Sequence, residues 1–232
     1  MTVIDVGQGL SLLFQTPHHS LLFDAGPTRV AGGMGGTRVL APLLMDRGVK
    51  SLDRVIISHG DDDHQGGLPA LMGLVPAEQI FAGEPKKLKA KGLSAQPCRA
   101  GQHWRWDGVD FALLHPTKRA HKGNNQSCVL QVTYNNTRLL VPGDLEKSGE
   151  KRLVNKYKNQ LHSTILVAGH HGSKTSSSAS FIAKVQPKWV IFSSGYLNRY
   201  GFPHAVVVDR FHTIGAKLSN TAYDGEMTWV LN

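Results

Sequence analysis

The sequence lacks a long apolar run and has few cysteines. No stretch of 18 apolar residues occurs in its 232 residues, so no membrane-spanning helix is expected within them. No basic stretch followed by an apolar core and a small-residue cleavage site opens the chain, so no export signal is evident. Cys98 and Cys128 can pair or stay buried as thiols, and their spacing alone does not decide. We therefore expect a soluble polypeptide.

Acidic residues are also scarce. The chain has 17 Asp and Glu against 26 Lys and Arg, a formal net charge of +9, within an ordinary globular composition. Many of the basic residues lie between residues 85 and 122, where the sequence has only Asp107 and Asp110 to balance them: Lys86, Lys87, Lys89, Lys91, Arg99, Arg105, Lys118, Arg119 and Lys122. Such a segment is either a solubilising face or a surface for a polyanion, whose phosphates supply salt-sensitive affinity.

Short apolar or alternating runs separated by turn residues predict many strands. We expect strands at 3–6, 10–15, 20–24, 79–82, 110–114, 128–134, 138–141, 164–167, 188–192, 216–219 and 226–231, and helices at 38–47, 68–74, 146–157, 177–185 and 204–214. Asn135-Asn136 predicts a hairpin between two of these strands. The strands outnumber what one doubly wound sheet needs. We predict an α/β fold, an αββα sandwich of two facing mixed β-sheets with helices outside, in one domain over residues 1–232.

The most informative segment is His59-Gly60-Asp61-Asp62-Asp63-His64, which follows the apolar run Val55-Ile56-Ile57 and precedes a helix start at Leu68-Pro69. A strand that ends in a tight loop can aim two imidazoles and two carboxylates at one point, whereas a helix would fan them around its circumference. The alternative is a solvated acidic loop with incidental histidines. Two further loops at similar junctions favour a metal site.

These two loops also follow apolar strands. The loop Pro142-Gly143-Asp144 comes directly after the strand predicted at 138–141, and Gly169-His170-His171-Gly172 follows the one at 164–167. An isolated Gly-Asp pair is usually a turn or a helix N-cap. Adjacent histidines between glycines, however, have no obvious packing purpose. The loop with His170 and His171 therefore strengthens the interpretation of Asp144 as a metal ligand.

Together these motifs resemble the metallo-β-lactamase superfamily, whose His-x-His-x-Asp-His motif, later Gly-Asp loop and last His loop hold one or two metals between two sheets. More narrowly, six segments are similar to the soluble domain of the ComEC family of competence DNA-uptake channels: 5–9 (DVGQG), 22–26 (LFDAG), 59–67 (HGDDDHQGG), 143–144 (GD), 170–175 (HHGSKT) and 198–204 (NRYGFPH). The resemblance implies a domain excised from a larger membrane protein.

The resemblance also implies a ligand set for two divalent ions. His59 and Asp61 would bind one ion, Asp63 and His64 the other, and Asp144 would bridge them. One histidine of the third loop would complete the site; we prefer His170, which is nearer the strand end, with His171 supporting it. The chain departs from the superfamily pattern in two places: Asp61 stands where a second histidine is usual, and no middle-loop histidine has a counterpart in Asn124-Asn125-Gln126-Ser127. Asn124 is a possible oxygen donor, and His115 and His121 are weaker candidates. This oxygen-rich set favours Mn²⁺ over Zn²⁺, with Mg²⁺ also possible.

Such a site predicts attack on phosphorus by a metal-bound hydroxide, with Asp63 orienting the water. Ser173 and its neighbouring amides, just before a predicted helix, would hold a phosphate oxygen, and Lys174 would add charge. His204 would protonate the leaving oxygen and Tyr200 would stack on a base; alternatively their loop only caps a helix around a buried histidine. Asp5 and Asp24, at strand ends, are expected to orient the histidines from behind.

We therefore expect a metal-dependent DNase, or phosphodiesterase, that hydrolyses the non-transported strand during DNA uptake. Its partners would be DNA, bound through Lys86, Lys87, Lys89 and Lys91, and the membrane channel of the parent protein, with the domain on the extracytoplasmic side and no small-molecule cofactor. The alternatives are a hydrolase of small phosphodiesters and a non-catalytic DNA-guiding domain. β-Lactam hydrolysis is disfavoured by Asp61 and the missing middle histidine.

Overall fold

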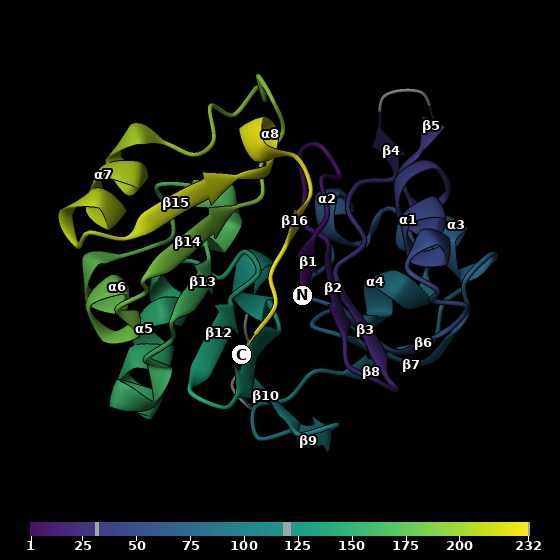
Figure 1. Ribbon diagram of the computed structural model, residues 1–232, viewed down its shortest axis with the longest axis horizontal. Coiled ribbons are helices and arrows are strands. Elements are labelled where there is room, and N and C mark those ends of the chain that lie inside the picture. The colour runs from purple at the N-terminus through teal and green to yellow at the C-terminus, as the bar shows by residue number, and fades with distance from the viewer. Residues whose placement is uncertain (31–32, 118–121, 232) are drawn as a thin grey trace.

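Two seven-stranded β-sheets face each other, and helices cover their outer faces (Figure 1). The computed structural model describes residues 1–30, 33–117 and 122–231. The predicted αββα sandwich is confirmed, with both sheets mixed. Within the described residues, no helix has both the length and the apolar character that crossing a membrane requires.

The first sheet is antiparallel on one side and parallel on the other, with β3 as the strand where the direction of pairing changes. Its spatial order is β16 (Met227–Thr228), β1 (Thr2–Val3), β2 (Leu12–Gln15), β3 (Ser20–Phe23), β6 (Leu52–Ile57), β7 (Ala77–Ala82) and β8 (Gln96–Pro97). Leu44 of α1 (Ala41–Asp46), Leu71 of α3 (Leu68–Met72) and Leu88 of α4 (Pro85–Lys89) pack on its outer face.

The second sheet has the same mixed character. Its order is β15 (Lys217–Asn220), β14 (Trp189–Phe192), β13 (Ile165–Val167), β12 (Thr137–Val141), β11 (Val129–Tyr134), β10 (Val109–His115) and β9 (His103–Trp106). The strands β12 to β15 are parallel, and β9 to β12 are antiparallel. Leu153 of α5 (Lys147–Tyr157), Phe181 of α6 (Ala179–Val185) and Phe211 of α7 (Ala205–Thr213) cover its outer face.

The alternation along β2 shows how the two layers of core form. Leu12 and Phe14 enter the core between the sheets, where the Phe14 ring meets Phe111 edge to face at 6.2 Å, while Leu13 between them joins Leu44 in the core under the helices. Successive side chains on a strand point to opposite faces, so a strand buried on both sides has an apolar side chain at each of these positions. Each such large side chain contributes about 1.5–3 kcal/mol by leaving water.

The hairpin around Asn135-Asn136 is confirmed by the pairing of Tyr134 with Thr137. Several short elements differ from the prediction. The metal motif is not all loop, because Asp62–Gln65 forms α2, and β4 (Arg29–Val30) pairs with β5 (Gly33–Met34) where no strand is expected. α4, β9 and α8 (Thr221–Asp224) were not expected, and the last strand pairs only at β16.

A disulfide joins Cys98 to Cys128, and so settles the pairing that the sequence leaves open. Cys98 follows β8 of the first sheet and Cys128 precedes β11 of the second. The backbone N–H of Cys128 also donates to the carbonyl of Ser58, one residue before the metal motif. The bond therefore links the two sheets close to the loops that carry the candidate ligands.

Candidate metal centre

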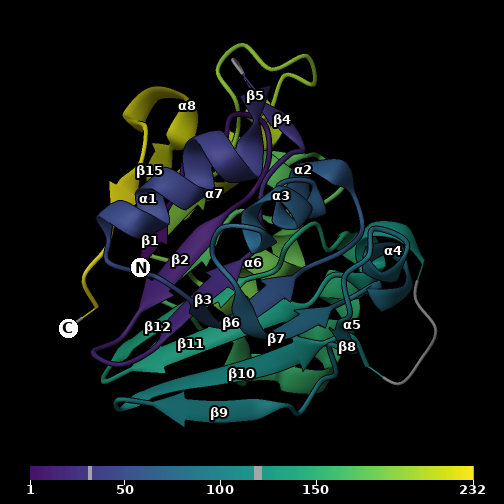
Figure 2. The ribbon, with the colours of Figure 1, turned by 90° about the vertical axis from the view of Figure 1, so that its right-hand side faces the viewer.

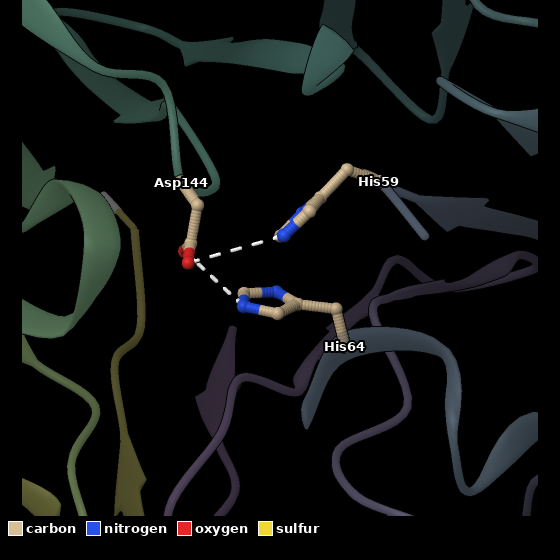
Figure 3. Close-up of side chains that lie close together, drawn as sticks. All are labelled: His59, His64 and Asp144. Atoms are coloured by element: carbon tan, nitrogen blue, oxygen red, sulfur yellow. Dashed lines mark ion pairs between the residues drawn. The ribbon is translucent and has the colours of Figure 1, made fainter. Parts of the chain in front are cut away.

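Three strand ends bring the candidate ligands together. β6 ends just before His59, β12 just before Asp144, and β13 just before a 3₁₀ turn (Gly169–Gly172) that holds His170 and His171. β12 and β13 are parallel, so their carboxyl ends open at the same edge of the second sheet. The ring of His59, in the loop after β6, and that of His64, in α2, point at Asp144 (Figure 3).

Asp144 divides the four histidines into two pairs. Its Oδ1 lies 3.1 Å from Nε2 of His64 and 3.7 Å from Nε2 of His171. Its Oδ2 lies 3.9 Å from Nε2 of His59 and 3.5 Å from Nε2 of His170. Each carboxylate oxygen of this buried aspartate therefore faces one pair of imidazole nitrogens.

A second carboxylate accompanies each pair. Asp63 Oδ2 lies 3.2 Å from Nε2 of His171 and 3.8 Å from Nε2 of His64. Asp61 Oδ2 lies 3.5 Å from Nε2 of His59. We call His59, Asp61, His170 and Asp144 Oδ2 the Asp61 group, and Asp63, His64, His171 and Asp144 Oδ1 the Asp63 group.

All four imidazoles are held from behind, so that Nε2 is the atom presented to the centre. Nδ1 of His64 donates to Asp24 Oδ2 at 2.8 Å, and Nδ1 of His171 donates to the carbonyl of Ser193 at 2.7 Å. The contact of Ser58 Oγ with Nδ1 of His59 (3.0 Å) and that of Thr175 Oγ1 with Nδ1 of His170 (3.1 Å) complete the set. A ring whose Nδ1 carries the proton has a lone pair at Nε2, which is the usual state of a metal-binding histidine.

These atoms suit a cation. Nε2 of His64 and Nε2 of His171 approach to 3.1 Å, a distance at which two lone pairs repel unless a proton or a metal ion lies beside them. Among the described residues, the buried atoms His59 Nε2 and Asp144 Oδ1 have no hydrogen-bond partner. Buried polar atoms without partners are rare and costly, so the residues present fit divalent metal ions.

The pKa shifts of these groups have the same origin. Burial opposes ionisation of Asp144, but His64 and His171 outweigh it and hold the pKa of that carboxyl well below its usual range. Burial likewise disfavours charge on His64, yet Asp144 and Asp24 raise its pKa well above normal. For Asp63, burial is outweighed by the hydrogen bond from His171, and the pKa falls to about 2. Carboxylates that stabilise protons on buried imidazoles will also stabilise metal ions in their place.

The loop that carries His170 and His171 has an uncommon backbone. Both residues have left-handed backbone angles, with φ of 51° and 54°. Non-glycine residues seldom adopt this region, and such conformations gather at functional sites. The two rings stand at 72° to each other, so that His170 lies near Oδ2 of Asp144 and His171 lies near Oδ1.

Comparison with known families agrees with this geometry. The profile of the metallo-beta-lactamase superfamily matches residues 4–194, which includes every residue of both groups. The chain belongs to the metallo-beta-lactamase superfamily. Members of this superfamily are usually metal-dependent hydrolases, and the superfamily fold implies divalent metal ions, for which this chain offers the clusters His59, His64, Asp144 and Asp63, His64, His171.

Relatives that match almost the whole chain include competence proteins. The chain is 44% identical to competence protein ComA of Neisseria gonorrhoeae over 100% of its own length and 32% of that protein, and 30% identical to ComE operon protein 3 of Bacillus subtilis (strain 168) over 98% and 32%. The predicted resemblance to the ComEC-type domain is confirmed. The chain spans about a third of the length of these curated relatives. The metallo-beta-lactamase fold protein YhfI of Bacillus subtilis has the same fold, with a TM-score of 0.60, 14% identity, and coverage of 94% of this chain and 95% of that one.

The structure places the two histidines of the last loop near opposite oxygens of Asp144. The sequence favours His170 as the ligand and gives His171 a supporting role. In the structure His171 is buried at 3% exposure, and its Nε2 lies in the Asp63 group, so a purely supporting role does not match its position. His170 also reaches Asp144, but on the opposite oxygen.

Three other expected roles do not match the geometry. Asp5 is exposed and its carboxylate caps the N–H of Gly7 in a turn, away from the histidines. Ser173 Oγ is engaged with Thr175, and the next helix, α6, begins only at Ala179, so the amides near Ser173 do not form a helix N-terminus. His204 is the N-cap residue of α7 and packs against Phe202 at 5.2 Å; no hydrogen bond or ion pair among the described residues joins it to either group.

Asp24 matches its expected place behind a histidine. Besides holding His64, its carboxylate accepts from the backbone N–H and hydroxyl of Ser58, at 2.6 and 2.7 Å. Asn124 Nδ2 lies 3.5 Å from Nδ1 of His170, behind that ring, and is not on the side of Asp144. Nδ1 of His115 is hydrogen-bonded to the carbonyl of Ser127. His121, Lys118 and Arg119 lie outside the described residues.

The predicted basic surface is a helix beside the centre. Lys86, Lys87 and Lys89 lie on α4, with Lys91 two residues after its end, and all four are exposed. Lys87 Nζ lies 3.6 Å from Asp61 Oδ1 and 3.1 Å from Glu84 Oε2, which places one positive charge at the edge of the Asp61 group. Lys174 is exposed on the last histidine loop, and Tyr200 is 47% exposed.

Sequence reasoning missed the residues that hold the rings from behind. Ser58 Oγ contacts Nδ1 of both His59 and His64, whereas Ser193 and Thr175 each contact one Nδ1, through a backbone carbonyl and a hydroxyl. Ser58 and Ser193 are the first residues after β6 and β14, and their position at a strand end was the available indication. Neither type of residue is distinctive enough to be singled out without the fold.

Proposed function

We propose that this domain is a metal-dependent DNase that hydrolyses the non-transported strand during DNA uptake, as the extracytoplasmic part of an integral membrane protein. The observation that carries the proposal is the pair of His-Asp groups that share Asp144, with basic α4 at one edge. Paired cations next to a basic surface suit a polyanionic phosphodiester. DNA and the channel portion of the parent protein are the proposed partners.

Each group is proposed to hold one divalent ion. Two ligands that each lie about 2.1 Å from the same ion are about 3.0–3.5 Å apart for octahedral or tetrahedral angles. In the Asp61 group, His59 lies 3.5 Å from Asp61 and 3.9 Å from Asp144, and His170 lies 3.5 Å from Asp144. The contacts in the Asp63 group are 3.1 to 3.8 Å, and the ligand atoms of its members Asp63, His64 and His171 all lie within 4.8 Å of one another, so this group is the more compact of the two. Both groups supply two imidazole nitrogens and two carboxylate oxygens.

When bound, the two ions supply positive charge to a phosphate and make a water molecule acidic enough to attack near neutral pH. The side chains have separate tasks. Asp63, one-third exposed and ionised at neutral pH, is placed to accept a hydrogen bond from the attacking water. Asp24 fixes the ring of His64, and Lys87 adds charge beside Asp61. His204 is not proposed as a proton donor, because its ring packs edge-on against Phe202 and no hydrogen bond or ion pair among the described residues joins its side chain to either group.

The disulfide supports the proposed location. Disulfides form and persist in oxidising compartments and are rare in the bacterial cytosol. Cys98 and Cys128, the two cysteines of the chain, form such a bond. The extracytoplasmic side of a membrane provides these conditions.

The proposal is tested by DNA cleavage with defined metals. We expect the metal-free domain to cut DNA after addition of Mn²⁺, faster than with Mg²⁺ or Zn²⁺, because half of the proposed ligand atoms are hard carboxylate oxygens. Cleavage of labelled single- and double-stranded DNA is measured against metal concentration, with EDTA as the control. Substantial activity with Zn²⁺ and none with Mn²⁺ would contradict the metal assignment. No cleavage with any ion at low salt would contradict the function and favour a domain that only guides DNA.

The basic helix is expected to set the salt dependence of DNA binding. Replacing Lys86 and Lys89 together by alanine should reduce the slope of log Kd against log salt by about 0.7 for each phosphate of single-stranded DNA that these lysines neutralise. Both side chains are exposed on α4, and the change leaves Lys87 beside Asp61 in place. The slope is measured by fluorescence anisotropy between low and high salt, with Lys184→Ala on α6 as the matched control. An unchanged slope in the double variant would remove α4 from the DNA-binding surface.

A further inference from the structure

A cleft opens beside the Asp63 group, on the side away from α4. It has a volume of about 530 Å³, and its lining includes Gln8, Pro27, Arg29, Asp63, Arg199 and Tyr200. Figures 1 and 2 show the β4–β5 hairpin and the long loop before α7 at the same end of the molecule. The cleft therefore starts at a proposed metal ligand and is walled by two segments far apart in the sequence.

Two arginines give this cleft a positive wall. Arg29 is exposed and makes no hydrogen bond or ion pair among the described residues, and the Arg199 guanidinium contacts the hydroxyl and ring of the neighbouring Tyr200. The acidic residues of the lining are already engaged: Asp62 accepts from the N–H and hydroxyl of Thr28, and Asp63 faces His171. Arg29 is thus available to a phosphate, and Arg199 becomes available if it leaves Tyr200; a guanidinium can bind a phosphate through two parallel hydrogen bonds.

A stack of rings leads from the metal centre into the cleft. The His171 and Phe202 rings are stacked with centroids 6.2 Å apart, and the Phe202 and Tyr200 rings are stacked at 5.3 Å with an angle of 17°. The loop is held in shape by Asn198, whose side chain bonds both the N–H and the carbonyl of Phe202. Tyr200 is therefore a half-exposed ring in a fixed orientation, at the end of a stack that begins at a proposed metal ligand.

We propose that this cleft binds the nucleotide next to the scissile phosphate in a single-stranded DNA. The base stacks on Tyr200 in place of the Arg199 guanidinium, which now lies 4.8 Å from the centre of the ring, and the adjacent phosphate is held by Arg29 and Arg199. Unpaired bases stack on aromatic side chains irrespective of sequence, whereas a duplex keeps its bases stacked on each other. This inference rests on the proposed DNase function and names single-stranded DNA as its substrate.

Binding tests the inference without requiring cleavage. The probe is a fluorescein-labelled 12-mer of thymidylate, measured by anisotropy with the whole chain in EDTA. Tyr200→Ala is expected to raise Kd about 5- to 100-fold, the usual effect of removing one stacking ring, and Arg29→Ala to raise it and flatten its salt dependence. Tyr200→Phe, which keeps the ring, should recover most of the loss. Tyr223→Ala, a 78% exposed tyrosine packed on Tyr196, is the matched control and should bind as wild type does.

A kinetic measurement adds a second readout. With Mn²⁺ present, Tyr200→Ala should raise KM for the 12-mer more than it lowers kcat, because the residue binds the flanking nucleotide and does not contact the reacting atoms. The same sequence as a duplex should bind more weakly and respond less to Tyr200→Ala.

The inference is overturned if wild type binds the 12-mer and both Tyr200→Ala and Arg29→Ala bind it equally well. It is also overturned if wild type hydrolyses bis(p-nitrophenyl) phosphate but has no measurable affinity for the 12-mer. The proposed function fails separately: in that case wild type binds the 12-mer through Tyr200 and Arg29, yet cuts no DNA with any metal.

Discussion

Asp144→Asn is expected to lower metal-dependent DNA cleavage by on the order of 10³-fold. The substitution keeps the shape of the side chain but removes its charge, and it puts an amide N–H where one pair of histidines now faces an oxygen. Because Asp144 Oδ1 and Oδ2 face different histidine pairs, a single change damages both groups. The rate is measured on labelled single-stranded DNA with saturating Mn²⁺, and bound Mn²⁺ is counted by elemental analysis after desalting.

Asp5→Asn is the matched control for this change. Asp5 also lies in a loop at a strand end, but it is exposed and caps only the N–H of Gly7. We expect the cleavage rate of Asp5→Asn to stay within about threefold of wild type, because substitutions of exposed residues outside the core and the site usually have small effects. Equal loss in the two variants would mean that the Asp144 effect is not specific, and cleavage retained in Asp144→Asn would remove this carboxylate from the site.

The second large effect is expected from the two adjacent histidines, taken separately. His171→Ala should lose the ion of the Asp63 group and His170→Ala that of the Asp61 group, so that each variant binds one Mn²⁺ ion fewer than wild type. The reason is geometric: His171 Nε2 lies 3.2 Å from Asp63, whereas His170 Nε2 lies 3.5 Å from the opposite oxygen of Asp144. Mn²⁺ binding is followed by calorimetry and by the Mn²⁺ electron paramagnetic resonance signal, whose spin coupling requires two neighbouring ions.

His162→Ala provides the comparison, since His162 is exposed and precedes β13, at the end of that strand opposite to His170 and His171. It should bind metal as wild type does. Loss of the coupled signal in both His170→Ala and His171→Ala, with one ion retained in each, is the expected pattern. Full metal binding by His170→Ala would contradict the ligand role of His170 and leave the Asp61 group without its second imidazole.

Regular patterns made most of the fold predictable. Alternating and apolar runs identified the strands, and Asn135-Asn136 between two of them identified the hairpin that pairs Tyr134 with Thr137. The elements that were missed are short. α4, for example, has five residues with a Pro at its start and one buried side chain, Leu88, so its apolar periodicity is too brief to detect. It forms because Leu88 docks under the first sheet, which is tertiary information.

The candidate site was predictable where a ligand type and a strand end coincide. His59, Asp63, His64 and Asp144 meet both conditions. The choice between His170 and His171 was beyond the sequence, because neighbouring residues diverge by an angle that depends on their backbone, and both are left-handed here. Asp5 and Asp24 likewise share a position at a strand end, yet β3 runs on to bury Asp24 behind His64 while the chain turns outward at Asp5.

The bond between Cys98 and Cys128 has a consequence for the unfolded chain. It closes a loop with a sequence separation of 30 residues, and a closure of that size removes conformational entropy worth about 3–4 kcal/mol at 25 °C in the chain-entropy treatment. That is a large part of the roughly 5–15 kcal/mol by which domains are usually stable. Of the four histidines of the centre, His59 and His64 follow a strand of the first sheet, and His170 and His171 follow a strand of the second. The oxidised chain therefore loses less conformational entropy than the reduced chain when the two sheets come together. Assembly of the centre is thereby coupled to the oxidation state of the surroundings in which the domain folds.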